Sequence, residues 1–126
     1  MEDKIRQLAE LEDYAKSIGF KWDNIDVIIA QIISECHEIQ KAISDQETQS
    51  RVHEEVGDLL HGIISLCFFM KINVDDTITK IHEKFLARIR GLEALAEARG
   101  IVLSEDLSAK AVLKLWQDVK KLSKDI

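Results

Sequence analysis

Two pairs of acidic residues, each pair spaced three residues apart, are the part of this sequence most suited to chemistry. Glu35 and Glu38 form one pair, and Glu55 and Asp58 form the other. Residues three apart lie on one face of a helix, so both carboxylates of a pair can reach one ion. The pairs are also symmetric about a polar break at 44–47. An antiparallel hairpin folded at this break would bring all four carboxylates to the same height.

Four carboxylates packed together would repel one another, and their pKa values would rise. A hard divalent cation removes that penalty, and ligation by oxygen alone suits Mg²⁺ or Mn²⁺. Helical rotation of about 100° per residue puts both pairs on flanks of apolar stripes. These flanks either face each other or both face away, and periodicity does not choose between the two. The alternative interpretation is solvated helix charge, because the chain carries 23 acidic residues.

The elements that would position these carboxylates are all predicted to be helices. The chain has no proline and only five glycines, so long helices meet few breakers. Gly19 and Gly100 are placed to end helices, Asp23 or Asn24 to cap the second, and Ser104 or Ser108 to cap the last. Apolar residues at helical spacing mark helices in 25–43 and 52–70, on either side of the polar break. Three more helices are predicted at about 1–17, from Asn73 or Asp75 to 99, and from Ser104 or Ser108 to 124.

These helices predict an all-α fold, a four-to-five-helix antiparallel bundle formed by residues 1–126 as one domain. The fourth helix, of about 25 residues, would be roughly 37 Å long. That is more than a lone domain of this size needs. A partner subunit is therefore expected to complete the bundle.

The composition argues against several classes of protein. Apolar residues make up 46% of the chain and charged residues 32%, as in a globular protein. The net charge of −6 argues against a nucleic-acid partner. No apolar run approaches the roughly 18 residues that span a bilayer, so no membrane partner is expected. The first residues do not resemble a signal peptide, and two cysteines are too few for a disulfide scaffold, so we expect a cytoplasmic protein.

Five sequence stretches together resemble the MazG family of nucleoside triphosphate pyrophosphohydrolases. The second acidic pair lies in a Glu-Glu-Val-Gly-Asp-Leu-Leu segment at 54–60, downstream of the Glu-x-x-Glu pair. The other stretches are Gly-Phe-Lys-Trp-Asp at 19–23, Lys-Phe-Leu-Ala-Arg at 84–88, and Leu-Trp at 115–116 followed by Lys120. The resemblance covers nearly the whole chain.

The resemblance implies a MazG-like all-α enzyme, a homodimer or homotetramer, that uses Mg²⁺ with Mn²⁺ as a substitute. It would cleave a nucleoside triphosphate between the α and β phosphates, giving the monophosphate and pyrophosphate. The four acidic residues would hold the metal. The resemblance further implies that phosphates and nucleotide are bound by Arg51, Lys84, Arg88, Trp116 and Lys120, with the last two supplied by the same subunit or by a partner. Lys84 and Arg88 lie one helical turn apart, although such a pair also fits a solvated cationic face.

Three positions depart from the family pattern. Ser34 replaces a glutamate next to the first acidic pair, Gln31 a lysine one turn earlier, and His82 an asparagine before the Lys-Phe segment. Two other interpretations therefore remain open. One is a di-iron carboxylate bundle, to which Asp58-x-x-His61 is the closest approach. The other is a non-catalytic module that keeps metal or nucleotide binding.

Overall fold

The computed structural model describes residues 2–123, and within them it contains five helices and no strand. The expected all-α fold class is thereby confirmed. Met1 and Lys124, the outer limits of the predicted first and last helices, lie outside the described residues. The helices are α1 (Glu2–Ser17), α2 (Ile25–Ser44), α3 (Gln49–Phe69), α4 (Val74–Ala98) and α5 (Ala109–Leu122).

The helix ends follow local chemistry. Asn24 caps α2, where its side chain accepts a hydrogen bond from Val27 N at 3.1 Å, and Ser108 caps α5 in the same way. Thr48 accepts from Arg51 N at 3.2 Å, so α3 begins at Gln49, three residues before the first residue of its apolar stripe, Val52. Beyond α1, Gly19 has φ +98°, a conformation that favours glycine.

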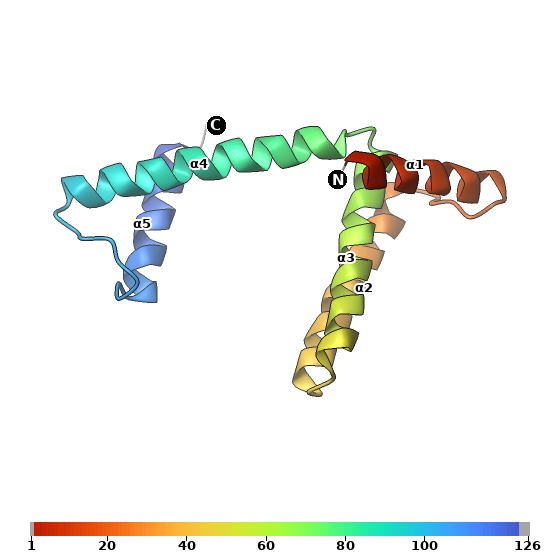
Figure 1. Cartoon of the computed structure of the whole chain (residues 1–126), viewed down its shortest axis with the longest axis horizontal. Helices are drawn as coiled ribbons and strands as arrows, with labels where there is room; N and C mark the ends of the chain where they lie inside the picture. Colours follow the sequence, from red (N-terminus) through yellow and green to blue (C-terminus); the bar gives the residue numbers. More distant parts are fainter. Residues whose placement is uncertain (1, 124–126) are drawn as a thin grey trace. The chain divides into compact units, whose positions relative to one another are not determined.

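The chain packs as two compact units, 1–76 and 77–126. In the first, α2 and α3 form an antiparallel hairpin (Figure 1). Ile28 and Ala42 of α2 and Gly62 of α3 are buried in the seam between them. A Cβ atom on Gly62 would lie 3.1 Å from Ile32 Cγ1, so the two helices approach closely at this point. This hairpin carries both acidic pairs.

The helix α1 packs against the far end of α3 in the same unit. Ile64 and Cys67 of α3 form a buried cluster with Val74, and Ile5 and Leu8 of α1 pack against it. The hairpin thus carries α1 at the end opposite its 44–48 turn.

The second unit contains α5 and all of α4 from Thr77 onward. Leu115 and Val119 of α5 are buried, and Val119 packs where Gly91 leaves room on α4. Arg99 Nη1 lies 2.9 Å from Asp118 Oδ2, an ion pair that joins the two helices. A single domain over 1–126 stays a prediction, as does its completion by a partner subunit. Within residues 2–123, no helix has the length and apolar character needed to cross a bilayer.

Candidate functional site

The hairpin brings Glu35, Glu55 and Asp58 together. Carboxylate oxygens of all three lie within 4.8 Å of one another. The acidic flanks of α2 and α3 therefore face each other, which is one of the two arrangements that periodicity left open. Glu38 is exposed and lies outside this group, although its charge is near enough to act on Glu55. Three of the four expected carboxylates thus form one cluster, with the fourth beside it.

Glu55 is the buried member of the cluster. It is only 4% exposed, whereas Asp58 is exposed and Glu35 half-buried. Along α3 it occupies the same helical face as Val52, Leu59 and Gly62, so an acid stands where the seam otherwise has apolar residues or glycine. Burial of a carboxylate is unfavourable unless a cation compensates it.

The environment of Glu55 disfavours its charge. Burial raises the pKa of Glu55, and the charges of Asp58, Glu35 and Glu38 raise it further, whereas Arg51 lowers it. Arg51 Nη2 lies 2.6 Å from Glu55 Oε1. The raised pKa indicates that one guanidinium does not compensate this group fully.

Arg51 also contacts two other acids. Its Nη1 lies 3.1 Å from Glu54 Oε2, and its Nε lies 3.8 Å from Glu47 Oε1. These three acids raise the pKa of Arg51, chiefly through the hydrogen bond to Glu54. One positive charge is therefore shared among three carboxylates, and the cluster keeps an excess of negative charge.

Gln31 supplies a neutral donor to the cluster. Its Nε2 donates a hydrogen bond of 2.7 Å to Glu35 Oε1. This position was noted in the sequence only as a departure from a lysine. The amide orients the Glu35 carboxylate without adding a positive charge. An all-oxygen donor set with excess negative charge fits a hard divalent cation.

The imidazole that a di-iron site would need lies elsewhere. His61 Nε2 is 3.3 Å from Glu12 Oε1 on α1, and Ser65 Oγ donates a hydrogen bond to the same oxygen. His61 therefore belongs to a contact between α1 and α3. This geometry favours a site that uses oxygen ligands alone.

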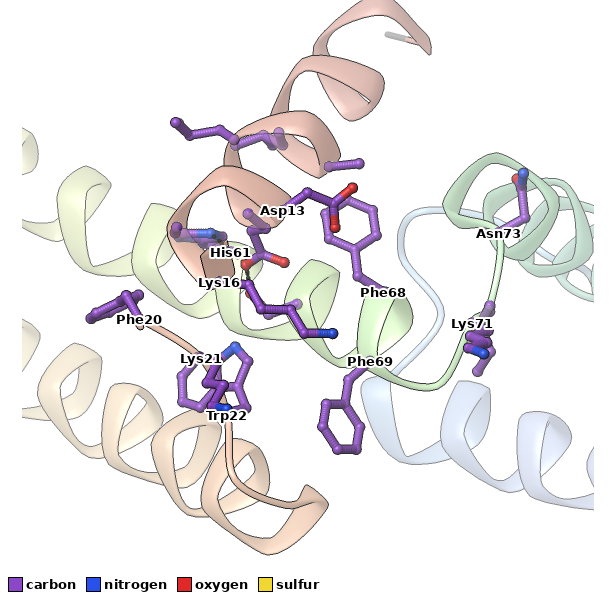
Figure 2. Close-up of a pocket in the computed structure, with 17 residues that line it drawn as sticks. Asp13, Lys16, Phe20, Lys21, Trp22, His61, Phe68, Phe69, Lys71 and Asn73 are labelled. Atoms are coloured by element: carbon purple, nitrogen blue, oxygen red, sulfur yellow. Dashed lines mark hydrogen bonds and ion pairs between the residues drawn. The ribbon is translucent and has the colours of Figure 1, made fainter. Parts of the chain in front are cut away.

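A cavity of about 610 Å³ lies between α1 and the end of α3. Phe20 and Trp22 border it from the segment after α1, and Phe68 and Phe69 from α3 (Figure 2). Glu12, His61 and Ser65 give it a polar wall, and Lys16, Lys21 and Lys71 also line it. Sequence analysis missed this cavity, because its walls come from segments some fifty residues apart and only the paired aromatics at 20 and 22 hint at it.

The remaining predicted nucleotide-binding residues belong to the second unit. Arg88 Cζ lies 5.8 Å from the centre of the Trp116 ring, and Phe85 meets that ring edge-on at 5.9 Å. These contacts join α4 to α5 and hold the indole between a cation and an aromatic ring. Lys84 and Lys120 are exposed on α4 and α5.

Comparison with known proteins identifies the hairpin as part of a described domain. Residues 24–91 match the model of the MazG nucleotide pyrophosphohydrolase domain. The chain belongs to the MazG family. The expected family is confirmed. The matched residues contain both acidic pairs, Arg51, Lys84 and Arg88.

Individual MazG relatives match most of the chain. The nucleoside triphosphate pyrophosphohydrolase/pyrophosphatase MazG of Thermotoga maritima is 29% identical over 110 residues, which are 87% of this chain and 41% of that protein. The nucleoside triphosphate pyrophosphohydrolase of Escherichia coli K12 is 25% identical over 121 residues, or 93% of this chain and 44% of that protein. The chain thus spans less than half the length of these relatives.

Proposed function

We propose that this MazG-family chain is a Mg²⁺-dependent nucleoside triphosphate pyrophosphohydrolase that cleaves between the α and β phosphates. The observation that carries the proposal is the cluster of Glu35, Glu55 and Asp58 within the matched domain. Glu38, on the same flank of α2, would complete the ligand set. Mn²⁺ would substitute for Mg²⁺, since both prefer oxygen ligands.

The carboxylates and the cations have distinct roles in this proposal. A divalent ion, when bound, neutralises the triphosphate and lowers the pKa of a bound water. Gln31 keeps the Glu35 carboxylate oriented, and the hairpin seam fixes Glu55. Lys84 and Arg88 bind phosphate oxygens, and Trp116 with Lys120 contributes to nucleotide binding.

The activity is tested by measuring pyrophosphate release from a panel of ribo- and deoxyribonucleoside triphosphates with Mg²⁺. We expect release from at least one nucleotide, and a loss of about 100-fold or more in Asp58→Asn, since even groups behind metal ligands contribute 10–100-fold. Asp26→Asn is the matched control, because Asp26 is an exposed acid on the same hairpin, outside the cluster. If the wild type releases no pyrophosphate but still binds Mg²⁺ and nucleotide, the chain is the non-catalytic module instead.

The two tryptophans allow a separate test of where the nucleobase of the substrate binds. Trp116 is the predicted contact of the nucleobase. Trp22 instead lines the cavity, and so does His61, which lies about one helical turn beyond Asp58 on α3. Fluorescence of Trp22→Phe and Trp116→Phe, titrated with a non-hydrolysable triphosphate, reports on each indole alone. We expect the nucleotide to change the emission of Trp116. A change confined to Trp22 would assign the base to the cavity.

We also propose that the chain forms a homodimer or homotetramer through the hairpin. Exposed apolar side chains lie on one face of each helix, about a quarter turn from the seam. They are Ile29, Ile33 and Ile43 of α2 and Val56, Leu60 and Ile63 of α3. In an antiparallel pair these faces lie on one side, opposite Glu38 and Asp58. A second copy would cover this apolar surface.

Light scattering tests this oligomer. The wild type should be an oligomer, and Leu60→Glu should weaken the association, because it places a charge on the apolar surface. A monomeric wild type would contradict the proposal.

A further inference from the structure

Arg51 is bound to the carboxylate that the proposed metal site needs most. Its Nη2 is 2.6 Å from Oε1 of Glu55, the buried member of the cluster. A divalent cation and a guanidinium are both positive, and they would compete for the same short contacts to this carboxylate. A metal ion bound at Oε1 of Glu55 would therefore displace the guanidinium or lengthen its contact.

Arg51 is placed so that its guanidinium can move away from Glu55. Its side chain is 47% exposed in the first turns of α3, so the guanidinium reaches water without disturbing the seam. Glu54 is 65% exposed and Glu47 39% exposed, and both keep contact with Arg51 from outside the cluster. The arginine thus has a second set of partners that does not depend on Glu55.

We propose, resting on the function above, that Arg51 is an exchangeable counter-ion. Without metal its guanidinium compensates part of the charge of the buried Glu55 carboxylate. On metal loading it gives up that carboxylate, and its fork of donors becomes free for phosphate oxygens of the nucleotide. A guanidinium suits this second role, because it binds phosphate through two parallel hydrogen bonds. Metal loading then prepares the site for the polyphosphate.

The exchange predicts effects of opposite sign when Arg51 loses its charge. Arg51→Met keeps a long side chain but removes the competitor, so Mg²⁺ or Mn²⁺ alone should bind about 5-fold tighter or more, the lower range of couplings between sites. The same variant should bind a non-hydrolysable triphosphate with Mg²⁺ about 10-fold more weakly, since it lacks the phosphate fork. A residue that only holds the helix together would not separate these two affinities.

The test is isothermal titration calorimetry of metal alone, and then of the triphosphate analogue at saturating metal. Lys41→Met is the matched control, because it removes an exposed positive charge from the same hairpin. It should change metal affinity less than Arg51→Met does. Thermal unfolding with and without metal checks that Arg51→Met folds, and metal should raise its midpoint more than that of the wild type.

The outcomes are distinguishable. Tighter metal binding with weaker nucleotide binding in Arg51→Met supports the exchange. Unchanged or weaker metal binding, or an effect equal to that of Lys41→Met, overturns the exchange but leaves the proposed function standing. A wild type that binds neither Mg²⁺ nor Mn²⁺ overturns the proposed function and the exchange together.

Discussion

Single residues in this chain reconcile burial with charge in different ways. Glu55 is buried against one guanidinium and other acids, and its pKa is raised. Asp118 is held by Arg99 and Lys114, which lower its pKa. The charge of Glu55 is therefore only partly compensated by positive groups, whereas the charge of Asp118 is compensated by Arg99 and Lys114. This contrast separates a candidate ligand from a structural ion pair.

The Asp118 ion pair predicts a specific dependence of stability on pH. Because its folded pKa is lowered, Asp118 contributes stability above the unfolded pKa of about 3.9, and this is lost as the pH falls through the lower folded value. Asp118→Asn should therefore lower the unfolding midpoint at pH 7. The difference from the wild type should close only as the pH falls below about 4. A difference that is constant with pH would show that charge is not involved.

Ser65 is expected to matter more than its size suggests. It is 2% exposed and donates to Glu12, which also contacts His61. Ser65→Ala removes a part-buried hydrogen bond to a carboxylate, which is worth about 1.5–3 kcal/mol. Urea unfolding measures the loss. Ser34→Ala, at an exposed position of α2, should change stability by no more than about 0.5 kcal/mol.

At the scale of the helix, two glycines of α3 offer a matched comparison. A Cβ on Gly57 would meet no atom within 4 Å, whereas one on Gly62 would lie 3.1 Å from Ile32. Gly57→Ala should stabilise the protein by up to about 1 kcal/mol through helix propensity. Gly62→Ala should gain less or lose stability, because the Ile32 side chain must give way to the added methyl group. Equal gains in chemical unfolding would mean that the seam is not close-packed there.

The helices were largely predictable from local sequence. Asn24 and Ser108 act as the predicted caps, and Gly100, with φ +68°, follows α4 as predicted. These helix ends could be predicted because each depends on only a few neighbouring residues. Thr48 was missed as a cap, because the sequence analysis named only a polar break before the apolar residues of α3. The omission has little effect, because the apolar period, not the cap, determines which face of α3 meets α2.

The carboxylate cluster was predictable in part. Symmetry about the turn brought the two acidic pairs to one height, but periodicity did not decide whether their flanks faced each other. Nor did it separate Glu38 from Glu35, because the gathering of oxygens depends on side-chain rotamers. The burial of Glu55 could have been predicted, because Glu55 shares a helical face with Val52 and Leu59. The sequence analysis instead placed Glu55 and Asp58 together on the flank of the apolar stripe.

For the molecule as a whole, the division into two units implies two separable binding properties. The cluster of carboxylates belongs to the first unit, and the contacts of Trp116 with Arg88 and Phe85 belong to the second. No linker rich in glycine or proline marks this division, so it was not predicted from the sequence. Damage confined to the second unit should therefore leave metal binding intact.

Leu115→Ala tests this separation. Leu115 is 1% exposed beside Trp116, and its truncation should destabilise the packing of α5 on α4 by about 2–5 kcal/mol. Binding of Mg²⁺ alone should stay within about 2-fold of the wild type, because the ligand candidates all belong to α2 and α3. Nucleotide affinity should fall by about 10-fold, or ~1.4 kcal/mol. Leu113→Ala, at a position 55% exposed on the same helix, should change neither. Loss of metal binding in Leu115→Ala would show that the two units depend on each other.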